Sequence, residues 1–301
     1  MKKKTQWFSG LIFFLIIIFL YKTSNQNQLI EIIKNINLKY LIITVLLFII
    51  RSFLINYRWF IIVKNFSKIS FIEFYKNLNI GTSLNLITSS SLAVELAKLF
   101  RIKKELGTKK SIFLVSLDKV YSLIFKIFFI VFVLNFYNYI YKPNLIMSGV
   151  IFSLFFFTIS LIVIKNTSKI LSYVSTIRFI KINFDKIIEL NKIISKSTSK
   201  IYLVNFLIQI LNIFLYFVIF ESLNTNLSFI QLSLFVPLLE LIGQFQFFIL
   251  GLKELSMIYL FQNLDLTQEI VFIAALLYIL CESFVITIIF LYFYLIGCIK
   301  K

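Results

Sequence analysis

Residues 247–261 read FFILGLKELSMIYLF and place two adjacent charged residues, Lys253 and Glu254, in a run that is otherwise apolar. The pair follows shortly after Gly251, a residue type that tolerates a change of backbone direction. A charge at the centre of a bilayer costs about 2.5 to 3.5 kcal/mol even on insertion scales, so such residues indicate function unless they are paired. The fold therefore depends on whether this run crosses a membrane unbroken.

The composition is that of an integral membrane protein. Hydrophobic residues make up 60% of 301 residues, and the mean hydropathy is +0.94. A soluble core cannot hide so large an apolar share. We expect residues 1–301 to form a single transmembrane domain. The net charge of +18 points to membrane lipids, mainly anionic, as partners rather than nucleic acid, because the lysines lie between apolar runs.

The residue inventory excludes several kinds of catalytic site. The chain has no histidine and only two cysteines, Cys281 and Cys298. A zinc site, a Ser-His-Asp triad and a Cys-His pair are therefore not expected. We predict no catalytic residue, no cofactor and no metal.

The apolar runs predict an all-α polytopic membrane protein with six spanning helices. We expect these at residues 7–21, 40–63, 112–141, 145–164, 201–220 and 270–298. Two further runs, 71–88 and 229–250, lead into the short charged segments SSSLAVELAKLF and GLKELSMIYLF. About 20 helical residues are needed to cross a bilayer, and these returning segments have only about ten to thirteen. We therefore expect two re-entrant helical hairpins, at residues 71–101 and 229–261.

The lysine clusters predict the orientation. Basic residues are enriched in cytoplasmic segments, and here they crowd at positions 2–4, 98–110, 165–200 and 300–301. We expect a multi-pass protein of the bacterial inner (plasma) membrane with both termini in the cytoplasm. The first hairpin would enter from the cytoplasm and the second from outside. Residues 165–200 fit an amphipathic cytoplasmic segment attracted to anionic lipid, or an ordinary loop.

The order of elements predicts an inverted repeat with halves at about 40–141 and 201–298. Short echoes agree with it: SFIE at 70–73 resembles SFIQ at 228–231, and ELA at 95–97 resembles ELS at 254–256. Inverted repeats whose broken helices meet near the midplane recur in transporters, where the free helix ends bind a ligand. The charged pair of residues 253–254 would then form half of a substrate site.

Two arginines extend the candidate site along the second helix. Arg51 and Arg58 lie seven residues apart, about two turns, and therefore project from one face. Their neighbours Tyr57 and Trp59 are of types enriched at membrane interfaces. This predicts Arg58 near the cytoplasmic headgroups and Arg51 about 10 Å deeper. Such a ladder suits the inward guidance of a phosphate.

Two interpretations of the buried charges stay open. In the first, opposite charges only hold helices together, with Arg51 paired to Glu95. Lys253 would then pair with Glu240 or Glu282. In the second, the cations receive an anionic headgroup, and the carboxylates compete with it or take up protons. The substrate-binding residues would then be Arg51, Arg58, Glu95, Arg101, Asp118, Lys119, Lys253 and Glu254.

Four motifs carry a family resemblance. A Tyr-Arg-Trp helix at 57–59 precedes the stretch NLITSSSLAVELAKLFR at 85–101; an acidic-basic pair follows at 118–119, and a Gly-x-Lys-Glu turn lies at 251–254. In this order they resemble the lysylphosphatidylglycerol synthase transmembrane region, a flippase-like integral membrane family. That family has a Gly-rich acidic turn with a trailing Arg in the first hairpin and a Gly-x-Arg-Glu motif in the second.

The resemblance covers roughly residues 40–298 and has departures. Serines stand at 89–91 where the family tends to have Pro and Gly, and Lys119 and Lys253 replace arginines. Lysine is a point charge without the bidentate grip of a guanidinium on phosphate, so affinity or headgroup choice would differ. The family's soluble aminoacyl-transfer domain is expected to be absent, since nothing follows Lys301. The resemblance implies a protein that moves a lipid and does not synthesise one.

The predicted function is therefore a lipid flippase for an anionic or polyisoprenoid-phosphate-linked lipid. Three arginines would recruit phosphate at the inner leaflet, Lys253 would bind it at the outer gate, and Asp118 would pair with a gate cation. Glu95 and Glu254 would hold the hairpin tips and trade protons. The recruiting arginines are Arg51, Arg58 and Arg101.

Two other functions stay open. One is a membrane-embedded lipid or glycosyl transferase that uses Glu95 or Asp118 as its base. The other is an accessory protein of envelope lipid or polysaccharide assembly, with envelope-biosynthesis proteins as its partners.

Overall fold

The computed structural model of the chain describes residues 25–88, 92–141, 197–243, 252–261, 264 and 266–299. Within these residues the secondary structure is helical and contains no strand. The helices are α2 (Gln26–Lys34), α3 (Leu38–Val63), α4 (Phe71–Thr88), α5 (Leu92–Tyr141), α9 (Thr198–Ser222), α10 (Phe229–Ile242), α11 (Leu252–Phe261) and α12 (Gln268–Ile299).

Three of the described helices are long and apolar enough to cross a membrane, namely α3, α9 and the stretch Gln268–Leu295 of α12. They correspond to the predicted spans at 40–63, 201–220 and 270–298. The predicted span at 112–141 forms the later part of α5. The predicted spans at 7–21 and 145–164, and nearly all of the segment 165–200, lie outside the described residues.

The first helix pair consists of α4 and the beginning of α5, which pack against each other. The predicted hairpin ended at Arg101, whereas the returning helix continues to Leu106. Gly107 interrupts it, with φ 75° and ψ 164°. Because this φ lies in the left-handed region that favours glycine, the chain turns sharply there. The lysine-rich stretch 98–110 is therefore helical on both sides of the bend.

The second helix pair consists of α10 and α11, which also contact each other. Residues 229–261 are therefore two helices rather than one rod. Ser228 begins α10 with a capping box, in which its side chain accepts from the amide of Gln231 while the Gln231 side chain accepts from the amide of Ser228. At α4, the Ser70 hydroxyl likewise accepts from the amide of Glu73. The SFIE and SFIQ echoes are thus matching helix starts.

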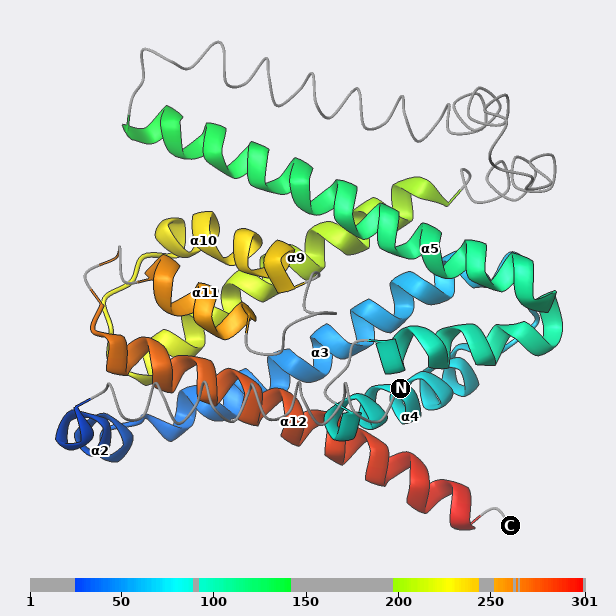
Figure 1. The fold of residues 1–301 in the computed structure, drawn as a ribbon, viewed down its shortest axis with the longest axis horizontal. Helices are drawn as coiled ribbons and strands as arrows, with labels where there is room; N and C mark the ends of the chain where they lie inside the picture. Colours follow the sequence, from blue (N-terminus) through cyan, green and yellow to red (C-terminus); the bar gives the residue numbers. More distant parts are fainter. Residues whose placement is uncertain are drawn as a thin grey trace, which may run out of the picture.

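The helices pack reciprocally. Helix α12, which follows the second pair, packs against α4 and α3, while α5, which begins in the first pair, packs against α10 and α9. Helices α3 and α9 make the most extensive contact, at the centre of the molecule. In Figure 1 the α4–α5 pair and the α10–α11 pair lie at opposite ends of the molecule.

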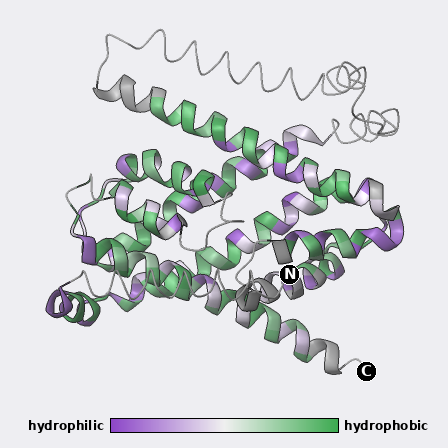
Figure 2. Cartoon of the chain, viewed as in Figure 1, coloured by the Kyte–Doolittle hydropathy of each residue, from purple (hydrophilic) through white to green (hydrophobic). Residues whose placement is uncertain are grey.

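Hydrophilic residues are prominent toward both of these ends of the molecule (Figure 2). Figure 2 shows hydrophilic colour on α2 and at the bend of α5, with apolar colour over much of the helices between them. Helix α2 is held in place by polar contacts. The Asn25 amide donates to Glu269 at 2.9 Å, and the Asn224 side chain donates to the Asn35 carbonyl at 3.1 Å. Its residues Ile30 and Ile33 are exposed.

Candidate functional site

A polar cavity of about 340 Å³ lies between the two helix pairs. Its wall comes from α3, α5, α9, α10, α11 and α12. Among the described residues, six cations (Arg51, Arg58, Lys98, Lys119, Lys126, Lys253) and four carboxylates (Glu95, Asp118, Glu240, Glu282) line it. Charge this dense among apolar helices requires pairing. The pairs form two clusters.

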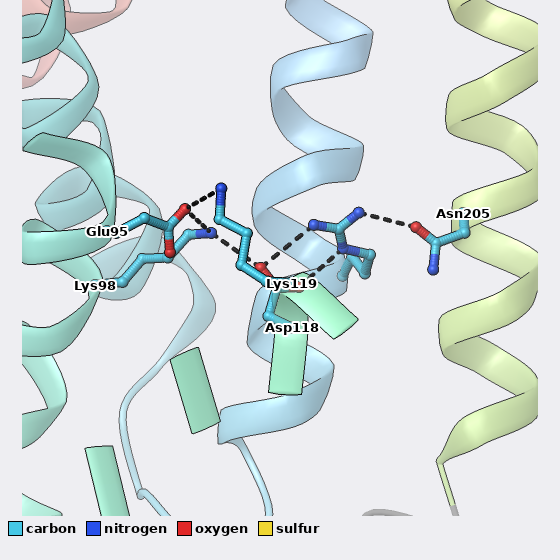
Figure 3. A network of polar contacts seen from close by, with 6 residues as sticks. Glu95, Lys98, Asp118, Lys119 and Asn205 are labelled. Carbon is cyan, nitrogen blue, oxygen red and sulfur yellow. Dashed lines mark hydrogen bonds and ion pairs between the residues drawn. The ribbon is translucent and has the colours of Figure 1, made fainter. Parts of the chain in front are cut away.

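The first cluster is centred on Asp118, which is 1% exposed. The Arg58 guanidinium donates to both carboxylate oxygens, from Nε to Oδ1 at 3.0 Å and from Nη2 to Oδ2 at 3.3 Å. Lys98 of the first helix pair donates to Oδ2 at 2.9 Å. Arg58 also donates to Asn205 of α9 at 2.8 Å. Figure 3 shows this network. Two cations on one buried carboxylate make Asp118 a junction of α3 and α5.

Glu95 extends this cluster toward the start of α5. Its Oε1 lies 3.3 Å from Lys98 Nζ and 3.1 Å from Lys119 Nζ, as Figure 3 shows. The Lys98 ammonium also lies 5.4 Å from the ring centroid of Trp59. We name the set of Arg58, Glu95, Lys98, Asp118 and Lys119 the Asp118 cluster.

The second cluster is centred on Glu240 near the end of α10. Lys253 of α11 donates to Oε1 at 2.7 Å, and Arg51 Nη2 lies 3.7 Å from Oε2. Lys126 of α5 donates to the Glu240 backbone carbonyl at 2.7 Å. Arg51 Nη1 donates to Glu282 at 2.7 Å. We name the set of Arg51, Lys126, Glu240, Lys253 and Glu282 the Glu240 cluster.

Aromatic and small residues shape the space around Lys253. Its ammonium lies 4.1 Å from the ring centroid of Tyr278 and 5.7 Å from that of Tyr216. A side chain at Gly243 would place its Cβ 3.4 Å from Lys253 Cδ. The aliphatic stem of Lys253 thus packs against the end of α10, while the ammonium faces two rings and a carboxylate.

Helix α9 contributes a stripe of amide side chains. Asn205, Gln209 and Asn212 are spaced four and three residues apart and are 2%, 2% and 1% exposed. Asn212 accepts from Arg51 Nε at 2.7 Å. Each of the three amides retains one buried atom without a hydrogen-bond partner within the described part of the chain. Gln209 and Asn212 line the cavity, which is thus both charged and rich in unused hydrogen-bonding groups.

The structure brings most of the predicted site residues together. Six of them line the one cavity: Arg51, Arg58, Glu95, Asp118, Lys119 and Lys253. Arg101 lies apart from the cavity and pairs with Glu73 and, at 3.6 Å, with Glu105. Glu254 lies within α11, but its side chain is outside the described set.

One predicted pairing is wrong. Arg51 pairs with Glu282 and Glu240 rather than with Glu95, because α12, which carries Glu282, packs against α3, while Glu95 faces two lysines. Trp59, a residue of a type enriched at interfaces, is 0% exposed, so its ring lies inside the protein. It points inward beside Phe74, with its ring centroid 6.3 Å from that of Phe74. The predicted alternative of Lys253 with Glu240 is confirmed.

Sequence reasoning missed several cavity residues and named Glu240 and Glu282 only as pairing partners. The missed residues are Lys98, Lys126, Gln209, Asn212 and Tyr278. The amides of α9 could have been found from the sequence, since their spacing puts them on one face of an otherwise apolar helix. Lys126 could also have been found, because it is a single charged residue among apolar residues well inside α5.

Comparisons with known proteins support the resemblance. A family model described as the lysylphosphatidylglycerol synthase TM region matches residues 6–289. No match is found among curated proteins or among solved structures. The matched range includes every residue of both clusters. The chain therefore belongs to the lysylphosphatidylglycerol synthase transmembrane-region family, a family of membrane proteins in lipid and envelope metabolism.

Proposed function

We propose that this protein is a lipid flippase that moves an anionic or polyisoprenoid-phosphate-linked lipid across the bacterial inner membrane. One observation carries the proposal: a cavity lined by six cations lies between two helix pairs that approach from opposite ends of the molecule. Moving a charged headgroup through bare hydrocarbon is unfavourable because the headgroup loses its hydrating water. A polar cavity between the helices offers hydrogen bonds and charges in place of that water.

The proposed membrane placement follows from helix lengths. At 1.5 Å per residue, the 14 residues of α10 extend about 21 Å and the 10 residues of α11 about 15 Å. Neither reaches across a hydrocarbon core of about 30 Å. We therefore propose that each helix pair is a re-entrant hairpin, one from each side, within six spanning helices. The reciprocal packing of α12 on α4 and of α5 on α10 supports the inverted repeat.

A second, smaller cavity of about 120 Å³ suggests where the acyl chains lie. It shares Arg51, Ile55, Val94, Lys98 and Glu282 with the main cavity, and its remaining lining is half apolar (Phe48, Val285, Ile286) and half polar (Ser52, Asn56, Thr82). Its position fits a lipid whose headgroup occupies the charged cavity while its first tail carbons leave sideways. The Arg51–Glu282 pair would then separate the headgroup from the tail.

The cations and carboxylates keep distinct roles in this scheme. Arg51 and Arg58 would guide the phosphate along α3, with Arg101 receiving it at the cytoplasmic end. Lys253 would bind it in the outer half. The carboxylates Glu95, Asp118 and Glu240 compete with the phosphate for the same cations, which keeps its binding weak enough for release.

A membrane-embedded transferase is the second candidate. Asp118 is a poor general base here because Arg58 and Lys98 occupy both of its oxygens. Glu95 is the better candidate, since its Oε2 has no hydrogen-bond partner among the described residues. An accessory role in envelope assembly is the third candidate.

Reconstitution in liposomes separates the three functions. With a fluorescent anionic lipid and a membrane-impermeant quencher, a flippase increases the quenched fraction and leaves the lipid mass unchanged. A transferase changes the mass, and an accessory protein changes neither. Lys253→Ala and Glu254→Ala should each slow transport about tenfold with normal expression, while Lys104→Ala, at an exposed lysine, should have no effect. Wild-type rates in both the Lys253→Ala and the Glu254→Ala protein would remove the site assignment.

A further inference from the structure

The Glu240 cluster contains a cation whose charge is poorly matched. Lys126 donates to a backbone carbonyl, and its Nζ lies 3.9 Å from the nearest Glu240 carboxylate oxygen. The residue is only 8% exposed. Lys253, by comparison, makes a direct bond to the same carboxylate at 2.7 Å. A buried ammonium that relies on a neutral carbonyl attracts a further anion.

Two unpartnered donors lie in the wall of the same cavity. Neither Asn212 Nδ2 nor the Tyr278 hydroxyl has a hydrogen-bond partner among the residues that the structure describes. These residues are 1% and 5% exposed. Leaving buried donors unpaired is unfavourable, so their presence in the same cavity as an under-neutralised lysine indicates a ligand with several acceptor oxygens.

The charge balance of the cluster agrees with an anionic ligand. Its three cations, Arg51, Lys126 and Lys253, face two carboxylates, Glu240 and Glu282. One positive charge is therefore left over within this cluster. A monoanion neutralises it, and it competes with Glu240 for the two lysines.

We propose that the Glu240 cluster is a binding site for a phosphate group. Lys126 and Lys253 neutralise the phosphate, and Asn212 and Tyr278 donate to its oxygens, while Glu240 occupies the lysines when the site is empty. A phosphate group presents its oxygens in a tetrahedral arrangement and can accept from donors on several sides, whereas the acceptor positions of a carboxylate lie in one plane. A phosphodiester lipid headgroup and free phosphate share this chemistry; the assignment to a headgroup rests on the proposed flippase function.

The test measures binding by the purified full-length chain, with two probes. Inorganic phosphate is titrated in detergent, and phosphatidylglycerol is titrated in nanodiscs that otherwise contain a zwitterionic lipid. Lys126→Met should weaken binding of the true ligand about tenfold or more, and Glu240→Gln should tighten it several-fold by removing the competing carboxylate. Tyr278→Phe should weaken it about threefold and leave the unfolding temperature unchanged. Lys104→Met is the matched control at an exposed lysine.

The opposite signs of the two central variants distinguish a binding site from a structural contact. If Lys126→Met and Glu240→Gln change affinity in the same direction, or if Lys104→Met equals Lys126→Met, the proposal is overturned. It is also overturned if wild type binds neither probe. If Lys126→Met does not fold, Glu240→Gln and Tyr278→Phe decide the question by the same signs.

The two probes and the liposome assay separate the possible failures. Lys126-dependent binding of phosphatidylglycerol alone supports a headgroup site, and equal binding of inorganic phosphate supports a site for the phosphate group itself. Lys126-dependent binding without lipid movement by wild type rejects the flippase function and retains the site. Normal lipid movement with unchanged affinity in Lys126→Met rejects the site and retains the function.

Discussion

The two clusters of the cavity share one arrangement of charges but differ in how closely the arginine approaches the central carboxylate. In each, a carboxylate lies between an arginine of α3 and a lysine of a short paired helix. The two sets are Arg58–Asp118–Lys98 and Arg51–Glu240–Lys253. Arg58 binds both oxygens of Asp118 at 3.3 Å or less, whereas Arg51 stands 3.7 Å from Glu240 and makes its shorter contact with Glu282.

This difference indicates a division of labour. A buried carboxylate held by two close cations is costly to separate from them, so it does not readily exchange its ion-pair partners. Glu240 has one close partner, Lys253 at 2.7 Å, and two looser ones, Arg51 at 3.7 Å and Lys126 at 3.9 Å. The donors of Asn212 and Tyr278 in the same cavity are unused within the described structure. We infer that the Asp118 cluster mainly holds helices together and releases its cations to a passing phosphate less readily than the Glu240 cluster does.

The strongest test of this division compares the two central carboxylates. Asp118→Asn leaves Arg58 and Lys98 buried with less counter-charge, which should cost about 3 to 5 kcal/mol of stability. Glu240→Gln should cost less than half of this, because Arg51 keeps Glu282 and Lys126 keeps a carbonyl. Thermal or denaturant unfolding in detergent measures both.

The control for this comparison is Glu31→Gln, at an exposed carboxylate of α2, which should change stability by no more than about 0.5 kcal/mol. Equal losses for Asp118→Asn and Glu240→Gln would contradict the division of labour.

A smaller effect is expected when the arginines of α3 are replaced by lysine. Arg58→Lys loses the two-point contact with Asp118 and the bond to Asn205, and should cost about 1.5 to 3 kcal/mol. Arg51→Lys can keep one short contact, so its loss should be about half as large. Unfolding midpoints of the two variants give the ratio, and a larger loss at Arg51 would reverse the comparison.

The helices could be read from the sequence because apolar length and helix-start residues are local signals. The spans at 40–63, 201–220 and 270–298 and the break within 229–261 follow from run lengths alone. The SFIE and SFIQ echoes have a local cause, since both are helix caps. The length of a helix and the caps at its ends depend on residues that are neighbours in the sequence, so both can be predicted from it.

The pairing of charges could not be read in the same way, because it depends on which helices cross. Arg51 meets Glu282 only because α12 packs on α3, and Trp59 turns inward only because α4 covers that face. Lys98 and Lys126 are two among 31 basic residues, so the abundance of lysine gives no reason to single them out. Charged residues within apolar runs predict buried charges but not which of these charges pair.

The glycines near the two helix pairs offer a further contrast. Gly107 has φ 75°, so Gly107→Ala should cost about 1 to 2 kcal/mol through backbone strain, although no described residue beyond its own stretch of chain comes within 4 Å of the added Cβ. Gly243 has φ −57°, and among the described residues its Cβ would meet the flexible Lys253 stem at 3.4 Å. Gly243→Ala should therefore change stability by no more than about 0.5 kcal/mol. Equal unfolding midpoints for the two variants would show that the bend of α5 is not held by Gly107.

The smallest effects are expected at the two matching helix starts. Ser228→Ala removes one hydrogen bond of a complete capping box and should cost about 1 kcal/mol. Ser70→Ala removes a single bond of 3.4 Å and should cost about half as much. Unfolding in detergent measures both, with Ser70→Asp and Ser228→Asp as variants that keep a capping oxygen and should retain most of the stability. If Ser70→Ala costs more than Ser228→Ala, the two helix starts are not equivalent caps, and the sequence echo loses its structural basis.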